Sequence, residues 1–305
     1  MLVDTSVQTS TQTYALFLAL GATLSFSASS LVYADYSSKV SVLWMNCFNS
    51  AIAFALLLIT LPLFFGGWHH AEPIVVAELM LSGLVGLNIA DLFLLKAFTK
   101  IGAARTLMLY GFQPVIIGVG AHLLFGQSLN PAKLIAVLFM IACLFTLSLE
   151  NFRVHKKWAV GGLVLALIAI TLDAGGILIT RTAFETTHVV TPVESHFYRC
   201  LGALLGFAVM SLFRPLPLVS GFLRWPARQR LLLLVAAFGG TYLSLLLYLY
   251  AVKYGHLASL AGITITGPMF ATTLECLIKR KPPSRYLLTA FGFFAVGFYV
   301  LIASS

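Results

Sequence analysis

The sequence predicts an all-α integral membrane protein in which ten transmembrane helices form two inverted repeats of five. Three observations predict this fold: a composition too poor in charge for a water-exposed surface, ten apolar runs of membrane-spanning length, and a repeat between the two halves. Hydrophobic residues make up 60% of the 305 residues, charged residues only 10%, and the mean hydropathy is +0.96. A soluble domain carries roughly 25% charged residues, so lipid is the solvent for most of this surface.

The net charge of +9 does not indicate nucleic-acid binding. The basic residues form short clusters between apolar runs, for example Arg153, Lys156 and Lys157, which is how topology signals are distributed. All four cysteines lie inside apolar runs, which argues against a secreted disulfide framework. Residues 1–13 are polar and have no basic segment, so we expect the first apolar run to remain as a span.

Ten apolar runs are long enough to cross a bilayer, which takes about 20 residues of helix. They lie near residues 14–33, 40–65, 74–97, 103–126, 131–149, 158–180, 191–213, 231–252, 257–278 and 285–303. The longest loop, 214–230, has no room for a soluble domain. Any chemistry must therefore take place within the membrane or at its edges.

The spans repeat along the chain. An offset of 153 aligns residues 38–50 with 191–203 and places Asn46 opposite Arg199. The same offset aligns a second set of positions: Gly86 with Gly239, Asn88 with Thr241, and Asp91 with Ser244. Because five is an odd number of spans, the second half must be inserted upside down relative to the first, which is an architecture of alternating access.

The end of each half has a common order of features. In 102–149 a glycine and small residues precede a span with Pro114 in its middle, and a small-residue helix follows; 255–303 repeats this order with Pro268. In this order the chain resembles the EamA-type permeases of the drug/metabolite transporter (DMT) superfamily. The resemblance implies two EamA-like repeats, residues 1–153 (spans 1–5) and 154–305 (spans 6–10), and metabolite transport.

Lysine and arginine in short loops mark the cytoplasmic side of a membrane protein. The loops after the odd-numbered spans hold 15 of these residues, the other loops hold 3, and Arg199 lies inside a span. This count predicts that both termini lie outside the cytoplasm, although the family resemblance implies termini inside. We expect a multi-pass protein of the bacterial inner (cell) membrane.

Charged side chains inside the spans are the first candidates for a functional site, because a charge at the bilayer centre costs at least about 2.5–3.5 kcal/mol. Asp173 lies in the middle of the sixth span and is followed by Gly175 and Gly176. It is either a cavity-facing carboxylate that binds a cation or carries a proton, or a neutral carboxyl hydrogen-bonded to a neighbouring helix.

The seventh span begins with three more candidates, Glu194, His196 and Arg199. His196 and Arg199 are three residues apart and share a helix face, whereas Glu194 points elsewhere. Arg199 can hold a carboxylate or phosphate by two hydrogen bonds, or form a structural ion pair with Asp173 or Glu275. For Glu194 and His196 the alternative to a substrate contact is a place at the water interface.

The ninth span contains a helix break, Gly267 and Pro268, followed by Glu275. Loosened backbone hydrogen bonding is tolerated in a membrane where neighbours or a cavity can satisfy it. Glu275 either belongs to a polar stripe that lines such a cavity or forms an i,i+4 pair with Lys279.

The first half offers a milder set of candidates for substrate binding or coupling: Asn46, Asn88, Asp91, Tyr110 and Gln113, with Pro114 as the helix break. Asp91 can instead pair with Lys96, five residues further on. Ionisable groups are therefore concentrated in the second half.

We find no nucleotide-binding or hydrolase motif, no metal site, since His69, His70 and Glu72 lack further ligands, and no sign of a cofactor. We expect a secondary transporter (permease), not an enzyme, that moves a small polar or amphiphilic metabolite, for example an amino acid, by alternating access around a central cavity. Proton coupling, exchange and facilitated diffusion remain open. The alternatives are an intramembrane lipid-modifying enzyme and a non-transporting scaffold. The expected partners are the small-molecule substrate and membrane lipid, with no nucleic acid, in a monomer or homodimer.

Overall fold

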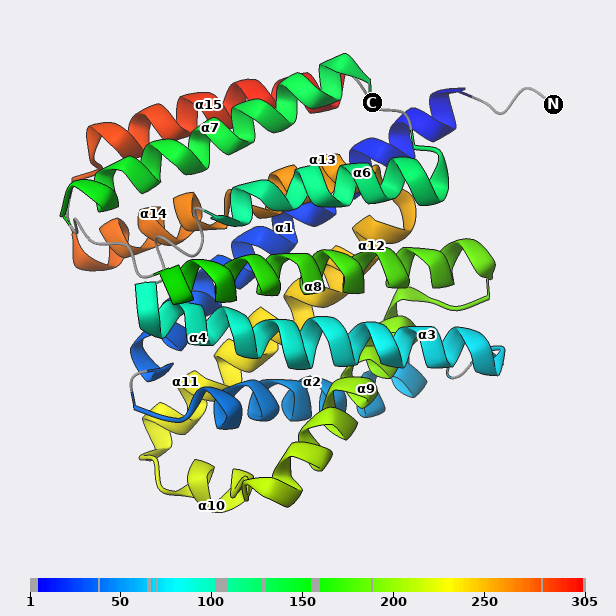
Figure 1. Ribbon diagram of the computed structural model, residues 1–305, viewed down its shortest axis with the longest axis vertical. Helices are drawn as coiled ribbons and strands as arrows, with labels where there is room; N and C mark the ends of the chain where they lie inside the picture. The colour runs from blue at the N-terminus through cyan, green and yellow to red at the C-terminus, as the bar shows by residue number, and fades with distance from the viewer. Residues whose placement is uncertain are drawn as a thin grey trace.

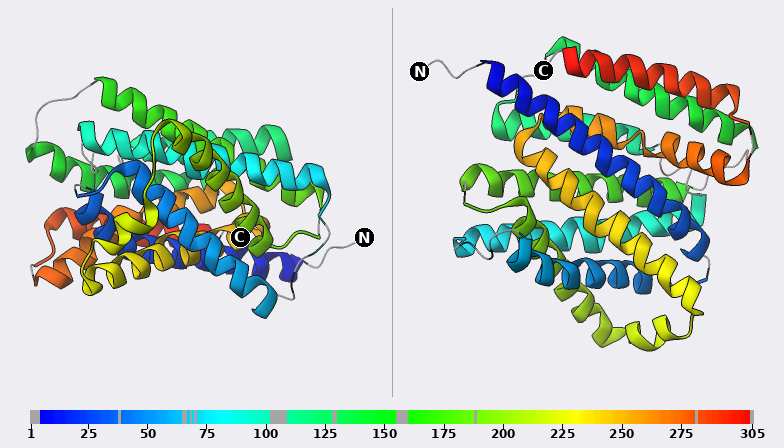
Figure 2. Two further views of the ribbon diagram at one scale, coloured as in Figure 1. Left: turned by 90° about the horizontal axis from the view of Figure 1, so that it is seen from below. Right: turned by 180° about the vertical axis from the view of Figure 1, so that it is seen from behind.

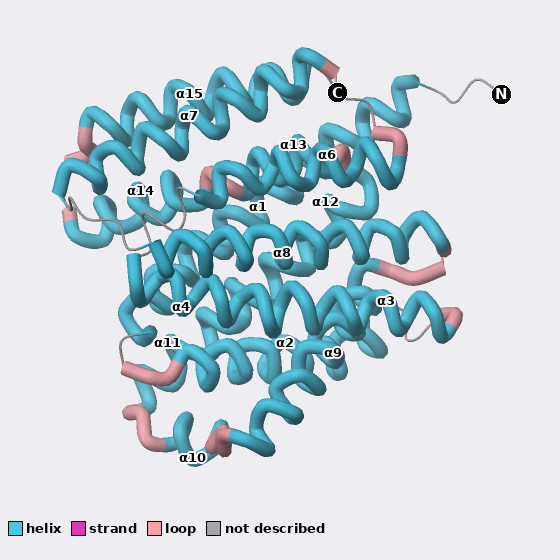
Figure 3. The backbone as a smooth tube through the Cα atoms, in the orientation of Figure 1, coloured by secondary structure: helices cyan, strands magenta, loops and turns pink. Residues whose placement is uncertain are grey.

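A computed structural model of the chain describes most of its residues. The described residues are 5–37, 39–64, 67, 69, 71–101, 109–127, 130–154, 160–187, 189–280 and 282–303. Within these ranges every regular element is a helix and no strand occurs, so the expected all-α class is confirmed there. Short loops join most of the helices (Figure 3).

The helices of the first half are α1 (Thr5–Ser37), α2 (Val42–Phe64), α3 (Pro73–Gly83), η1 (Leu84–Ala90), α4 (Asp91–Ile101), η2 (Tyr110–Phe112), α6 (Gln113–Phe125) and α7 (Pro131–Val154). Those of the second half are α8 (Val160–Thr186), α9 (Pro192–Phe213), α10 (Leu218–Leu223), α11 (Ala227–Ala237), η3 (Phe238–Leu243), α12 (Ser244–Tyr254), α13 (Leu257–Thr264), α14 (Gly267–Lys279) and α15 (Arg285–Ala303). The elements η1 and η3 are π-helical, and each joins the α-helices on either side of it into one long helix.

Seven helical stretches of the described chain are long and apolar enough to cross a membrane. They are Thr11–Tyr33, Val42–Phe64, Pro73–Ala97, Val160–Thr186, Pro192–Phe213, Ala227–Tyr254 and Leu257–Ile278. The three other expected spans correspond to shorter apolar helices, Gln113–Phe125, Pro131–Cys143 and Arg285–Val300. The first and sixth helices run beyond the expected 14–33 and 158–180, and the loop 214–230 contains the short α10.

Two spans are interrupted at a proline. Helix α6 begins at Gln113 with Pro114 in its first turn, directly after the 3₁₀ turn η2. In the same way α14 begins at Gly267, and α13 ends three residues earlier at Thr264. Proline is tolerated in the first turn of a helix because the N–H it lacks has no partner there anyway. The ninth expected span is therefore divided into α13 and α14, while residues 102–108 of the fourth lie outside the described part of the chain.

The helices pack side by side in a bundle (Figure 1). Helix α15 lies along α7, α13 beside α6, and α3 and α4 beside α8. Seen from behind, α1 runs next to α12 (Figure 2), and α1 begins at the end of the bundle where α15 finishes. The two halves also exchange partners: η1 of the first half packs on α8 and α9, and η3 of the second half packs on α1 and α2. This reciprocal packing is the pattern that a two-fold relation between the halves produces.

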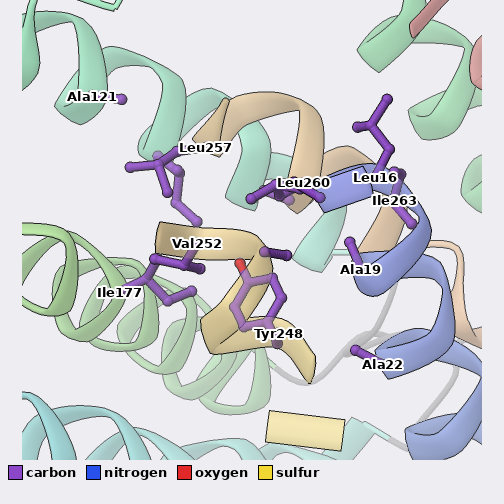
Figure 4. Close-up of a cluster of buried hydrophobic side chains, with 14 of the residues drawn as sticks. Leu16, Ala19, Ala22, Ala121, Ile177, Tyr248, Val252, Leu257, Leu260 and Ile263 are labelled. Carbon is purple, nitrogen blue, oxygen red and sulfur yellow. The ribbon is translucent and has the colours of Figure 1, made fainter. Parts of the chain in front are cut away.

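The largest apolar core lies where α1, α6, α8, α12 and α13 meet (Figure 4). Its members include Ile177, Leu257 and Ile263. Tyr248, which points its ring among these side chains, brings a hydroxyl into the core. Since lipid tails are as apolar as leucine, tight packing and interhelical hydrogen bonds hold such a bundle together, rather than the hydrophobic effect.

Candidate functional site

The backbones of the first and second halves come into direct contact where α3 crosses α9. A Cβ atom on Gly83 would lie 1.9 Å from the carbonyl oxygen of Arg199, and one on Gly202 would lie 2.0 Å from the carbonyl oxygen of Met80. Backbone therefore touches backbone, which is possible only where glycine leaves out the side chain. This crossing fixes where the side chain of Arg199 begins.

Arg199 and Asp173 converge beside Gly86, in the π-helical segment η1. The position that a Cβ of Gly86 would occupy lies 3.4 Å from a terminal guanidinium nitrogen of Arg199 and 3.8 Å from Oδ1 of Asp173. The two side chains interact electrostatically but form no close ion pair. Arg199 is only 2% exposed, and its Nε has no hydrogen-bond partner.

Asp173 is joined to the helix break of the first half. The side-chain amide Nε2 of Gln113, at the start of α6, donates a hydrogen bond of 2.6 Å to Oδ2 of Asp173. Tyr110, in the turn just before Gln113, lies within electrostatic range of both Asp173 and Asp91. The fourth span of one half thus meets the first helix of the other half at a carboxylate.

Asp91 is the second carboxylate of this centre. It starts α4 directly after the π-helical segment and lies within electrostatic range of Asp173 and Arg199. Asp91 forms no ion pair with Lys96, whose side chain is exposed. Asp91 and Asp173 are both half-buried as residues, whereas Arg199 is buried. We name Asp91, Gln113, Asp173 and Arg199 the charged centre.

The chemistry available at the charged centre is binding of polar or ionic groups, or exchange of a proton. A buried guanidinium with an unused N–H can donate to a carboxylate, and a carboxylate can accept a cationic group or a proton. The described residues contain no group of three or more His, Cys, Asp or Glu side chains arranged to hold a metal ion.

The equivalent crossing of the other half, where η3 packs on α1 and α2, is polar but uncharged. Three hydroxyl groups of α1 donate to backbone carbonyls across the interface: Ser25 to Gly239 at 2.7 Å, Ser27 to Gly267 at 2.9 Å, and Tyr33 to Ala236 at 2.7 Å. Asn46, which is aligned with Arg199, donates instead to the carbonyl of Leu87 at 2.9 Å. We name this set the neutral centre.

Glu194 lies at the start of α9, five residues before Arg199, and its carboxylate contacts the helix start and a loop. It completes a capping box with Thr191, whose backbone N–H donates to Oε2 at 2.9 Å. The backbone N–H of His69 donates to Oε1 at 2.5 Å, and the imidazole Nδ1 lies 3.2 Å from Oε2. Glu194 is 0% exposed, so its carboxylate is satisfied by protein groups. Its carboxylate ties the loop before α3 to α9.

His196 is likewise fully buried within the protein. Its Nδ1 lies 3.8 Å from the sulfur of Cys200, and its Nε2 has no hydrogen-bond partner. Asn88 of η1 donates to the carbonyl of Ala203 at 3.1 Å and keeps an unpartnered Oδ1. Asn88 thus joins η1 to α9, whereas the ring of His196 lies 6.5 Å from that of Tyr242 in η3. The side chains of Pro268, Glu275 and Lys279 lie outside the described part of the chain.

Reasoning from the sequence missed two tyrosines that interact electrostatically with the charged centre, of which Tyr33 also belongs to the neutral centre. Tyr248 lies within electrostatic range of Asp173 and Arg199, and Tyr33 within range of Asp91. A signal existed for Tyr248, which follows Ser244 by four residues and so shares its helix face. It also missed Ser82, whose hydroxyl lies 2.6 Å from the carbonyl of Gly176.

A helical bundle of two reciprocally packed halves around a polar centre is the architecture of a membrane permease. The chain matches the EamA-like transporter family twice, over residues 13–149 and 160–303, and belongs to that family. It is thus a multi-pass membrane protein of the DMT superfamily, of the EamA type with two repeats. It is similar in fold to a protein of known crystal structure, with 19% identity and a TM-score of 0.76 over 95% of this chain and 96% of the other. No curated protein sequence matches the chain.

Proposed function

We propose that the chain is a secondary transporter of a small polar or amphiphilic metabolite, such as an amino acid or a related compound. The observation that carries the proposal is the charged centre. Two half-buried carboxylates and one buried guanidinium meet where the halves cross. Charges are not maintained at such depth without a partner, a water-filled space or a function.

Alternating access is the mechanism that fits this placement. The charged centre takes Asp91 and Gln113 from the first half and Asp173 and Arg199 from the second, so rocking of one half against the other would change which side reaches it. The helix breaks at Gln113 and Gly267 supply backbone that can adjust during this motion. In this proposal Arg199 holds an anionic group of the substrate, and Asp173 binds its cationic group or a coupling proton.

We further propose ten spans, counting the three shorter apolar helices, in a bacterial inner membrane. Helices α1 and α15 begin and end at one end of the bundle (Figure 1), which supports an even number of spans. The distribution of lysine and arginine supports termini outside the cytoplasm. Labelling of single cysteines in the 214–230 loop tests this orientation: reaction with an impermeant reagent in intact cells would contradict it. A monomer or homodimer remains our expectation.

Flux into proteoliposomes tests the transport proposal. Ligands are first selected from amino acids and small organic ions by thermal shift, because a ligand that binds only the folded state raises the melting temperature. For a selected ligand we expect protein-dependent flux that falls at least about tenfold in Asp173→Asn and Arg199→Gln, each of which loses a charge-assisted contact.

The matched control is Glu185→Gln, which removes one negative charge from α8 as Asp173→Asn does. The side chain of Glu185 is 49% exposed and pairs with Arg181. This variant is expected to retain flux. Absence of flux for the whole panel in soundly reconstituted protein would contradict the transporter. Normal flux in both Asp173→Asn and Arg199→Gln would contradict the site.

A further inference from the structure

The outer surface of α11 carries two adjoining hollows, away from the charged centre. The first has a volume of about 260 Å³ and is lined by Phe222, Ala227, Arg230, Leu231 and Leu234. The second has a volume of about 340 Å³ and is lined only by apolar side chains: Ile52, Leu56, Leu234, Val235 and Phe238. Because Leu234 lines both, the hollows form one strip that we name the α11 groove. It has a basic end and a purely apolar end.

The basic end belongs to a segment of uncompensated positive charge. Residues 214–230 contain four arginines, and no aspartate or glutamate occurs between Glu194 and Glu275. None of the four arginines forms an ion pair with the part of the chain that the structure describes. Arg230 itself is half-buried against the wall of the first hollow. Arg230 therefore borders apolar surface and has no ion-pair partner among the described residues.

Aromatic side chains hold the wall of the groove in place. Phe222 of α10 stacks on Phe48 of α2 with ring centroids 5.2 Å apart, and Trp225 packs edge-on against Tyr36 at 5.3 Å. The indole N–H of Trp44 donates to the carbonyl of Pro217 at 3.1 Å. Tryptophan and tyrosine of this kind gather at the headgroup level of a bilayer. The aromatic residues beside the basic end of the groove favour a place for it at the membrane surface, with the apolar end toward the hydrocarbon.

We propose that the α11 groove is a binding site for an anionic phospholipid. The phosphate group lies against Arg230 and the start of α11 at Ala227, where the helix N-terminus adds partial positive charge. One acyl chain follows Leu234, Val235 and Phe238 into the apolar hollow. A soluble anion would leave this second hollow empty, and a zwitterionic lipid would leave the arginine charge of the segment uncompensated. The charge count that places this loop in the cytoplasm sets it against the leaflet that carries anionic lipid.

Native mass spectrometry of the full-length protein in detergent measures this binding directly. The probes are phosphatidylglycerol and, with the same acyl chains, phosphatidylcholine. We expect retained phosphatidylglycerol adducts and few phosphatidylcholine adducts. Arg230→Gln is expected to lower phosphatidylglycerol occupancy about fivefold, the effect of one arginine at an anionic membrane surface. Arg285→Gln is the control: it removes the same charge from an exposed residue of α15, which lies far from α10 and α11 (Figure 1).

A second variant tests the apolar end without removing charge. Val235→Trp fills the second hollow from a side chain that is 57% exposed, so the fold is retained and the adducts should again be lost. Equal occupancy by the two lipids, or equal loss in Arg285→Gln and Arg230→Gln, would overturn the proposal. Displacement of phosphatidylglycerol by glycerol phosphate at equal concentration would show an anion site without lipid recognition and would overturn it as well. None of these outcomes depends on transport, since lipid binding is read without substrate.

Discussion

The charged centre and the neutral centre occupy equivalent places in the two halves but use different chemistry. Gly86 and Gly239 are aligned by the repeat, yet a Cβ on Gly86 would meet Arg199 and Asp173, whereas a Cβ on Gly239 would meet the hydroxyl of Ser29 at 2.7 Å. In both, a glycine of a π-helical segment is covered by the first helix of the other half. The difference teaches that the repeat preserves the backbone of the crossing while the side chains diverge. Charged side chains therefore meet at only one of these two centres.

Substitution of Gly83 should cause the largest loss of stability among the changes that distinguish the two centres. The repeat aligns Gly83 with Ala236, which already carries a Cβ and is 1% exposed. Gly83→Ala would drive a methyl group into the carbonyl of Arg199, and backbone cannot move aside as a flexible side chain does. We expect a loss of at least about 3 kcal/mol of stability, visible as a large fall in melting temperature and in the monodisperse fraction.

The reverse change in the neutral centre, Ala236→Gly, is the matched control. It removes one methyl group from a helix and should cost about 1 kcal/mol. If Gly83→Ala proves no more harmful than Ala236→Gly, the close crossing of α3 and α9 is wrong.

Removal of the guanidinium should give the second largest effect. Arg199→Met leaves Asp91 and Asp173 without their cation and should destabilise the protein by about 3 kcal/mol. The aligned change, Asn46→Met, loses only a neutral hydrogen bond to the carbonyl of Leu87 and should cost about 1 kcal/mol. Reversible unfolding in mixed detergent micelles measures both. Equal losses in the two variants would show that the charges of the first centre are not coupled.

The smallest effect is expected where the two centres are alike. Ser82 donates to the carbonyl of Gly176 and Ser25 to the carbonyl of Gly239, so each hydroxyl ties a third helix of one half to the first helix of the other. Ser82→Ala and Ser25→Ala should each cost about 0.6 kcal/mol, the average for such bonds in membranes. The same unfolding measurement applies. A loss several times larger in Ser82→Ala would mean that this bond also supports the charged centre.

Much of the fold could be predicted from the sequence because lipid imposes simple rules on length and charge. The apolar runs predict the helices. An intramembrane charge is rare enough to single out Asp173 and Arg199 as candidate site residues. The prolines at 114 and 268 indicated where helices would be broken, and the structure starts α6 and α14 at those points. Each of these features is local, so a single stretch of chain is sufficient to find it.

The rest of the site could not be predicted because it depends on contacts between halves. No pattern in the sequence places Gln113 within 2.6 Å of Asp173, which is 60 residues away. The contribution of Tyr33 depends in the same way on packing across the interface. For Glu194 the local signal was present: Thr191 and Glu194 have the T-x-x-E spacing of a capping box, which favours a structural role at the helix start.

The π-helical segments have a consequence for any change in chain length. An α-helix turns by about 100° for each residue, whereas a π-helical turn accommodates one residue more than an α-helical turn. Deleting one residue within Leu84–Ala90 would let this segment relax to regular α-helix and would leave Asp91 near its present orientation relative to Gly83, whereas deleting one residue within the α-helical Pro73–Gly83 would rotate the start of that helix by about 100° relative to Asp91. The π-helical segment is thus the place in this span where the loss of one residue would disturb the direction of the Asp91 carboxylate least.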